Sequence, residues 1–331
     1  MKHISVIVPR GPVIIDTIIC PYNLFGMANA HYKQISGSGA PLYKVDLVGL
    51  DMDVVEYQGA FTVKPTASID HIKKTDLIVV SAISGNLQLG IDMNKEFFPW
   101  IKNHRITNGA DIASLCKGAF LLAETGLLNG KSCATHWTAQ NEFIERYPKV
   151  NLVPEKIICE DNGIYSSGGA YSFLNFMLYL IEKLYGRETA IWCSKVSEIE
   201  YDRMRQSHFA IFNGQKEHTD DEIKEAQQYI EEHYAEKLSI DELAERFKVS
   251  NRSFLRRFKK ATANTPLEYI QRVKIEAAKE SLEATAQNVN EVMYGVGYLD
   301  EKAFRNTFRK YTGLSPLEYR SKYNREMALA S

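Results

Sequence analysis

The chain has 331 residues, a length that favours two domains of about 150 residues each. Hydrophobic residues make up 45% and charged residues 24%, which excludes a largely disordered chain. The 40 basic and 41 acidic residues nearly cancel, but residues 246–325 hold 17 basic and only 8 acidic ones, so the rest of the chain is acidic. This basic block favours a polyanionic partner for the C-terminal part, although a solvated helix face rich in lysine would leave the same signature.

Several features predict a protein of the reducing cytoplasm. The longest apolar run, residues 173–181, is far shorter than the ~18 residues that span a bilayer, so we expect no membrane association. The N-terminus lacks the apolar stretch and cleavage site of a signal peptide. The five cysteines are odd in number and include no CxxC pair, which argues against a disulfide framework and a zinc site. We expect no cofactor and no metal.

The first ~190 residues alternate short apolar runs with helix-length segments. Parallel strands need such connections, so the pattern predicts an α/β domain with an open, mostly parallel sheet covered on both faces, a flavodoxin-like three-layer sandwich. The expected strands are residues 4–8, 43–50, 76–80, 112–116 and 164–167, and the expected helices are 93–103, 119–125, 137–147 and a buried one after 168–170.

Cys116 ends one predicted strand just before a glycine turn into a helix. A cysteine near a helix N-terminus can have a lowered pKa and an accessible sulfur. His136 lies downstream and could serve as its base, as in Cys–His nucleophilic catalysis. A cysteine on an apolar strand is more often a core residue, so both interpretations stay open.

Residues 204–219 show no sustained period and are predicted to be a linker, and helical patterns dominate from residue 220 to 325. This second part contains an internal repeat. A shift of 50 residues aligns Phe254 with Phe304, residues 258–260 with 308–310, and 265–269 with 315–319. Two copies are too few for a solenoid, so the repeat predicts a pair of small helical modules.

In each copy a short helix (240–247; 289–295) precedes a brief turn and a second helix (251–260; 301–310). This arrangement predicts a helix-turn-helix, whose second helix can enter the major groove of DNA. Ser250 and Asp300 stand at the expected N-caps. A small helical bundle with solvated cations is the alternative.

The second helices carry phenylalanines at i, i+4 that predict a buried stripe: Phe254 with Phe258, and Phe304 with Phe308. Side chains on the opposite face can bond base edges, and cations near the helix ends can bond phosphates. The predicted base contacts are Arg252, Leu255, Arg256, Lys302, Arg305 and Asn306. The predicted phosphate contacts are Lys259, Lys260, Arg309 and Lys310.

Residues 288–320, with the sequences VGYLD, FRK and GLSPLEYR, resemble the C-terminal module of AraC/XylS-family transcriptional regulators. The first copy is similar, but Ala263 stands where a glycine is frequent. The resemblance implies an all-α domain with two helix-turn-helix motifs that read successive major grooves on one face of double-stranded DNA.

Residues 1–203 resemble the PfpI-like, class I glutamine amidotransferase-like fold, through stretches 59–65, 76–80, 115–130 and 135–137. The combination is typical of GlxA-like regulators. Enzymes of that superfamily have a histidine after the cysteine, where this chain has Lys117, and a Gly-Gly where it has residues 81–85 (SAISG). Because these departures remove the base and blur the oxyanion hole, we expect no catalytic residue and a pocket that senses a ligand.

The expected effector pocket lies at the carboxyl ends of the strands. Its expected lining is Asp16, Asn23, Cys116, Lys117, His136 and Trp137. The resemblance implies a small nitrogenous effector such as an amino acid or a betaine, and Trp137 could bound a cationic group.

The whole pattern predicts a sequence-specific DNA-binding regulator, expected to be an activator, whose N-terminal domain senses a metabolite and forms a homodimer, and which works with RNA polymerase. Two alternatives remain. The protein could be bifunctional, with hydrolase or aldehyde-processing activity at Cys116, or its N-terminal domain could be a dimerisation scaffold only.

Overall fold

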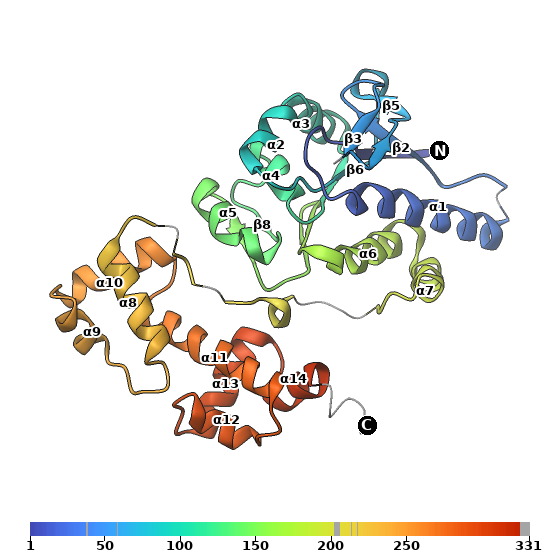
Figure 1. Cartoon of the computed structure of the whole chain (residues 1–331). Coiled ribbons are helices and arrows are strands. Elements are labelled where there is room, and N and C mark those ends of the chain that lie inside the picture. The colour runs from blue at the N-terminus through green and yellow to red at the C-terminus, as the bar shows by residue number, and fades with distance from the viewer. Residues whose placement is uncertain (38, 58, 202–205, 213, 217, 325–331) are drawn as a thin grey trace. The chain divides into compact units, whose positions relative to one another are not determined.

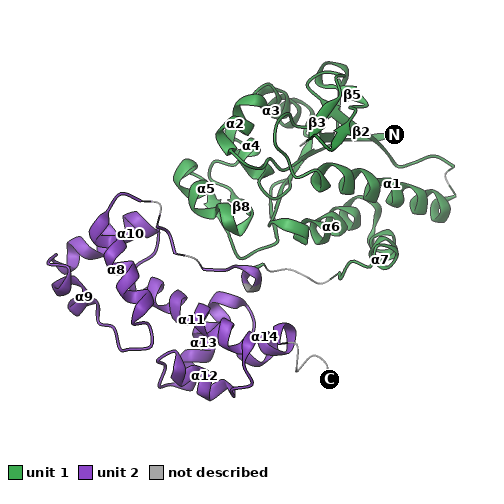
Figure 2. Cartoon of the chain, viewed as in Figure 1, with its two compact units in different colours: residues 1–206 green, residues 207–331 purple. Residues whose placement is uncertain are grey.

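The computed structural model describes residues 1–331 except 38, 58, 202–205, 213, 217 and 325–331. The chain forms two compact units, residues 1–206 and 207–331 (Figures 1 and 2). Met204 and Arg205 of the predicted linker and Arg325 at the predicted domain end lie outside the described residues.

Unit 1 is built on a seven-stranded sheet with the order β10-β11-β7-β6-β1-β2-β5. All neighbouring pairs are parallel except β10 with β11, which confirms the predicted mostly parallel α/β sheet. Two small two-stranded sheets, β3-β4 and β8-β9, accompany it. The strands are β1 (Lys2–Ile7), β2 (Tyr43–Gly49), β3 (Val55–Tyr57), β4 (Phe61–Val63), β5 (Ala67–Ser68), β6 (Leu77–Val80), β7 (Asp111–Ser114), β8 (Ser132–Cys133), β9 (Asn151–Leu152), β10 (Ile158–Asp161) and β11 (Ile164–Ser167).

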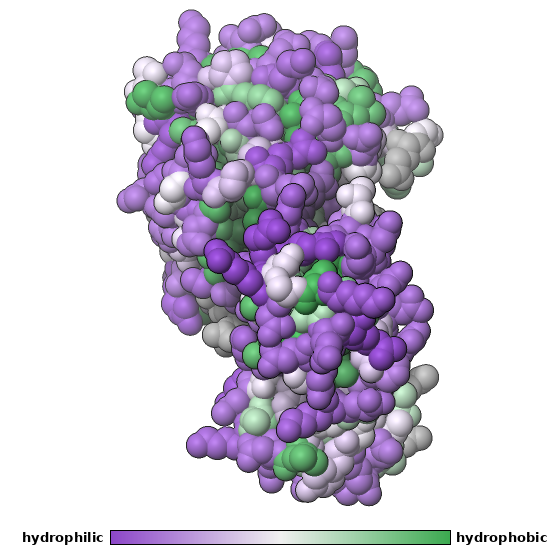
Figure 3. Space-filling view, turned by 90° about the vertical axis from the view of Figure 1, so that its left-hand side faces the viewer, coloured by the Kyte–Doolittle hydropathy of each residue, from purple (hydrophilic) through white to green (hydrophobic). Residues whose placement is uncertain are grey.

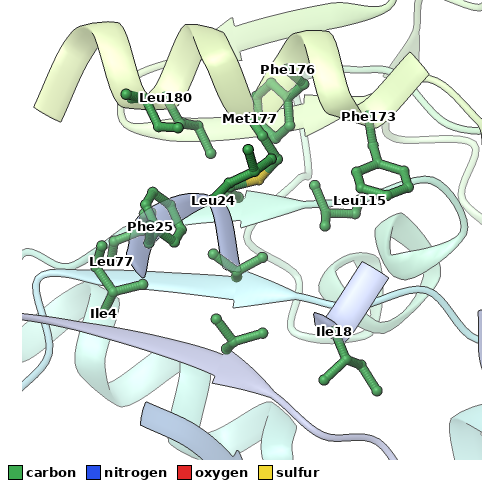
Figure 4. Close-up of a cluster of buried hydrophobic side chains, with 14 of the residues drawn as sticks. Ile4, Ile18, Leu24, Phe25, Leu77, Leu115, Phe173, Phe176, Met177 and Leu180 are labelled. Atoms are coloured by element: carbon green, nitrogen blue, oxygen red, sulfur yellow. The ribbon is translucent and has the colours of Figure 1, made fainter. Parts of the chain in front are cut away.

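Side chains of the central strands alternate between two hydrophobic cores, because successive residues of a strand point to opposite faces. In β6, Leu77 and Val79 belong to one core, and Ile78 and Val80 belong to the other. In the first core, side chains of α1 and α6 meet those of the strands (Figure 4). The sheet is therefore buried on both faces, as the near-continuous apolar runs predict.

The described part of unit 1 has seven α-helices; the first five lie between strands along the chain, and α6 and α7 follow the last strand. They are α1 (Asp16–Ser36), α2 (Leu87–Met93), α3 (Phe97–Asn108), α4 (Gly118–Glu124), α5 (Gln140–Arg146), α6 (Phe173–Tyr185) and α7 (Arg187–Val196). The 3-10 turns of this unit are η1 (Ile69–His71), η2 (Trp137–Ala139) and η3 (Ala170–Ser172).

The predicted helix over residues 93–103 is confirmed from residue 97 onward as part of α3, but its predicted start is wrong, because α2 ends at Met93. The side chain of Asn94 is buried, donates to the carbonyls of Gly90 and Arg10, and accepts the Arg10 N–H at 2.8 Å. These bonds hold the helix end against the loop after β1, and α3 starts afresh at Phe97. An asparagine that bonds nearby backbone groups competes with helix continuation.

Unit 2 is helical, with one 3-10 turn, η4 (Ser207–Phe209), and seven α-helices in its described part. They are α8 (Asp221–Glu232), α9 (Ile240–Arg246), α10 (Asn251–Thr262), α11 (Pro266–Ala284), α12 (Val289–Gly295), α13 (Glu301–Thr312) and α14 (Pro316–Tyr323). Helices α9 and α10 form the first helix-turn-helix, and α12 and α13 form the second.

On the face drawn in Figure 3, hydrophilic side chains dominate and apolar ones occur in small separate groups.

The capping and packing predicted for the two second helices are confirmed. The Ser250 side chain accepts the N–H of Ser253, and the Asp300 side chain accepts that of Ala303. Phe254 and Phe258 are fully buried in one core, and Phe304 and Phe308 in another.

Helix α11 belongs to both of these cores. Its first half contributes Tyr269 and Ile270 to the core of the first module, and its second half contributes Ile275, Ala278 and Leu282 to that of the second. A continuous helix shared by two cores restricts how the modules can rotate against each other.

From residue 207 onward, the described part of the predicted linker packs on unit 2. The Ser207 hydroxyl donates to the carbonyl of Thr312 at 3.1 Å, and the Lys279 ammonium donates to that of Ala210 at 2.8 Å. The ring of Phe212 meets Tyr269 edge-on at 5.1 Å between centroids. Residues 207–212, 214–216, 218 and 219 are called the strap below; the strap contacts α8, α11 and the end of α13.

Ala263 ends α10 in the left-handed region, with φ 56°, where Gly313 ends α13 with φ 78°. A Cβ is strained there, so Ala263→Gly should stabilise unit 2 by about 0.5–1 kcal/mol and Gly313→Ala should destabilise it by a similar amount. Urea unfolding followed by far-ultraviolet circular dichroism measures both changes. Tryptophan fluorescence is the internal control, because Trp100, Trp137 and Trp192 all lie in unit 1. If Ala263→Gly destabilised unit 2, the left-handed backbone conformation of residue 263 would be contradicted.

Candidate nucleic-acid interface and cysteine site

The polar faces of the two second helices present the predicted DNA contacts. All ten side chains predicted to touch bases or phosphates are exposed, opposite the buried phenylalanines. On α10 they recur at Arg252, Arg256 and Lys260, which lie one helical turn apart. Since the phenylalanine pairs of both copies hold the same positions, α10 and α13 turn equivalent faces outward.

The two helices differ in how their arginines are held. Arg252 and Arg256 make no ion pair with any other residue that the structure describes, and neither do Lys259 and Lys260. On α13, by contrast, Arg305 pairs with Glu301 at 2.6 Å and Arg309 approaches Glu318 at 3.8 Å. An anionic ligand could therefore bind the cations of α10 directly. On α13 it would first have to displace the carboxylates that pair with Arg305 and Arg309.

An arginine of α11 connects the strap to the second recognition helix. The Arg272 guanidinium lies over the ring of Phe212, at 5.5 Å from its centroid, and over that of Tyr311, at 4.9 Å. Burial lowers the pKa of Arg272, and the Tyr311 hydroxyl donates to Gln271 at 3.0 Å. Each of these contacts is a favourable cation–π geometry, so the Arg272 side chain links α11 to both the end of α13 and the strap.

A cleft of about 270 Å³ in unit 2 is lined by the strap residues Phe212 and Gly214 and by side chains of α8 and α11. Its lining includes Glu231, Glu276 and Glu280. Three carboxylates repel a polyanion, so this cleft is not where DNA would bind.

Cys116 occupies the sharp turn between β7 and α4 in unit 1. Its backbone φ of 52° is left-handed, and its carbonyl accepts the hydroxyl of Thr135 at 3.0 Å while its N–H donates to Ser167 at 3.2 Å. The thiol is only 1% exposed and lies against the N–H groups of Lys117 and Ala170. Burial raises the pKa of the Cys116 thiol, and these two N–H groups and the Lys117 charge oppose the rise without cancelling it.

Lys117, His136 and Trp137 lie around this turn. The His136 ring is 5.6 Å from that of Trp137, and its Nδ1 accepts the N–H of Thr138 at 3.1 Å. Burial and the nearby Lys117 charge lower the pKa of His136, which favours a neutral imidazole. Among the described residues no hydrogen bond joins the Cys116 thiol to His136, so the pairing that nucleophilic catalysis requires is missing there.

Asp16 lies at the start of α1 and reaches the cysteine turn only indirectly. Its carboxylate accepts the Tyr171 hydroxyl at 3.3 Å, and Tyr171 follows Ala170, whose N–H faces the thiol. Asn23 lies two turns further along α1 and is exposed. The structure thus gathers Cys116, Lys117, His136 and Trp137 and attaches Asp16 through Tyr171, whereas Asn23 is exposed on α1.

Gln206, which lies within the predicted linker, joins two of the loops at this site. It is 1% exposed; its Nε2 donates to the carbonyl of Thr135 at 2.9 Å and its Oε1 accepts the N–H of Gly169 at 3.0 Å. Thr135 precedes His136, and Gly169 precedes Ala170. A polar residue in an aperiodic segment gave no signal of this role.

No group of three or more histidine, cysteine, aspartate or glutamate side chains is arranged to hold a metal ion in the part of the chain that the structure describes. In the same part, no helix is both long and apolar enough to cross a bilayer.

Comparisons with known proteins agree with this two-part organisation. Residues 38–183 match the DJ-1/PfpI family, and residues 243–322 match a helix-turn-helix domain. The HTH-type transcriptional regulator GbdR of Pseudomonas aeruginosa is 26% identical over 284 residues, which are 86% of this chain and 76% of that protein.

Two further relatives resemble unit 1. Isonitrile hydratase of Pseudomonas putida is 27% identical over 151 residues, 45% of this chain and 63% of the enzyme. The crystal structure of a ThiJ/PfpI family protein from Pseudomonas syringae, 18% identical, covers 61% of this chain and 76% of its own with a TM-score of 0.50. This likeness shows a shared fold.

A DJ-1/PfpI unit followed by paired helix-turn-helix modules defines a class of two-domain transcriptional regulators. The chain is a transcriptional regulator that joins an N-terminal DJ-1/PfpI domain to a helix-turn-helix domain, and it is similar to GbdR over most of its length.

Removing cations from the recognition helices should separate base reading from phosphate binding. Arg256→Ala and Arg305→Ala should each lower discrimination between a selected site and a scrambled duplex by about 1–3 kcal/mol, whereas Lys310→Ala should weaken binding to both alike. Fluorescence anisotropy titrations at several salt concentrations measure both effects. Lys102→Ala, an exposed lysine of α3, is the control. Unchanged discrimination in both arginine variants would contradict the assignment.

Proposed function

We propose that the protein is a metabolite-responsive, sequence-specific regulator that inserts α10 and α13 into consecutive major grooves on one face of DNA. The observation that carries this proposal is the duplicated recognition helix, with its phenylalanine pair buried and its cationic face exposed in both copies. Arginine and lysine can bond guanine O6 and N7, and Asn306 can bond adenine. A cytoplasmic homodimer that activates transcription with RNA polymerase completes the proposal.

The effector site in this proposal is the group around Cys116 in unit 1. Lys117 offers a cation for a carboxylate, and the Trp137 ring offers a face for a cationic nitrogen. A small nitrogenous metabolite that carries both charges, such as an amino acid or a betaine, suits this pair. The neutral His136 can add a hydrogen bond.

Gln206 and Ser207 supply a short covalent route from that site to the DNA-binding unit. Gln206 holds the loops of His136 and Ala170, and the next residue, Ser207, bonds the carbonyl of Thr312 at the end of α13. An effector that moved either loop would act on the first residue of the strap. Such coupling requires that the effector bind the DNA-competent state with a different affinity.

Calorimetric titration of the full chain with a panel of amino acids and betaines tests this proposal. We expect one compound to bind, and its affinity to change by about 5-fold or more when a selected operator is present. Lys117→Met should abolish binding while Lys102→Met leaves it intact. Identical affinity with and without the operator would refute the coupling.

A second candidate function is cysteine chemistry at Cys116, in addition to gene regulation. The left-handed backbone at Cys116 and the similarity of unit 1 to isonitrile hydratase favour it. The buried thiol and its raised pKa count against it, because a nucleophilic cysteine needs its thiolate.

Alkylation kinetics distinguish a buried thiol from an activated one. We expect iodoacetamide to label Cys116 slowly in the native protein at pH 7.5, with an apparent pKa above the ~8.5 of an unstructured cysteine. Mass spectrometry of native and urea-unfolded samples measures each cysteine separately, and Cys116→Ser identifies its signal. Rapid labelling with an apparent pKa below 7, together with turnover of an isonitrile or a glyoxal, would instead establish an enzyme.

A further inference from the structure

The two helix-turn-helix modules differ by one residue in the turn. Four residues separate the last residue of α9, Arg246, from the first residue of α10, Asn251. Five residues separate Gly295, the end of α12, from Glu301, the start of α13. The additional residue lies directly next to a recognition helix.

Backbone hydrogen bonds identify which residue is additional. The N–H of Val249 donates to the carbonyl of Ala244 at 3.0 Å, and the N–H of Tyr298 donates to that of Met293, also at 3.0 Å. Up to this point equivalent residues of the two modules are 49 positions apart in the sequence. From the N-caps Ser250 and Asp300 onward the offset is 50.

Leu299 is therefore the residue without a counterpart in the first module. Val249 and Tyr298, the last pair of equivalent residues before it, both pack in their modules. Val249 lies against the first core, and the Tyr298 ring is 5.4 Å from that of Phe304. Leu299 is 89% exposed, the highest exposure of any large apolar side chain in the described part of the chain.

Burial in the fold does not account for a leucine at this position. A side chain that exposed contributes almost nothing to the core, so its apolar surface is available to another molecule. It directly precedes the N-cap of α13, and the N-terminal residues of a recognition helix are the ones that approach base edges. Lys302, a predicted base contact, lies three residues further on.

We propose that Leu299 is a specificity-determining residue of the second module, whose side chain contacts the 5-methyl group of a thymine in the major groove. Thymine is the base that presents a methyl group there, and apolar side chains recognise it by contact. The inference rests on the proposed DNA-binding function. Because the first module lacks the additional residue, we expect the preference for thymine only in the part of the DNA site that the second module contacts.

Substitution of each thymine by deoxyuridine tests this contact, because it deletes only the methyl group. The operator is first selected from a random duplex library with the wild-type full-length chain. Wild-type protein, Leu299→Ser and Leu299→Ala are then titrated against duplexes with one thymine replaced at a time. The control is Ile106→Ser, which replaces a 68% exposed isoleucine of α3 in unit 1.

We expect deoxyuridine at one thymine to weaken wild-type binding about three- to tenfold and to have no effect on Leu299→Ser. Leu299→Ala should show a smaller response, and Ile106→Ser should behave as wild type. An equal loss in wild type and Leu299→Ser at every thymine would overturn the inference. Failure of the wild-type chain to select any sequence would instead refute the proposed function, so the two failures are distinguishable.

Discussion

Burial of the paired phenylalanines is the interaction on which the DNA-binding account depends. A helix with one strongly apolar stripe must turn that stripe into the core, and its opposite face then becomes solvent-exposed. Phe254 with Phe258, and Phe304 with Phe308, do this in two copies. Helix α11 contributes to both cores, so the outward faces of α10 and α13 are fixed relative to each other within unit 2.

In unit 1, burial keeps a potentially reactive group, the Cys116 thiol, away from solvent and in its neutral form. The turn after β7 holds Cys116 in a conformation that directs its thiol toward two backbone N–H groups, an arrangement that could stabilise a thiolate. Removal of the sulfur from solvent outweighs that effect and favours the neutral thiol. His136 is likewise favoured in its neutral form. These features support a sensing role better than a catalytic one.

Much of the fold could be predicted from the sequence, because the signals were local and repeated. Apolar runs located the central strands, and the 50-residue repeat located the recognition helices, their caps and their buried faces. Contacts between distant segments were not predictable. Asn94 ends a helix through bonds to Arg10, and Gln206 joins loops that lie more than 30 residues away along the chain. The special position of Leu299 is not visible in a repeat with a single offset of 50, because the offset changes from 49 to 50 within the turn.

The most direct test of the account is methylation protection of guanine N7 and adenine N3 on a selected operator, with the number of bound chains measured by native mass spectrometry. The account predicts that each chain protects major-groove N7 atoms in two clusters about 10 base pairs apart on one face of the duplex. A single protected cluster per chain, or protection confined to the minor-groove N3 atoms, would contradict it.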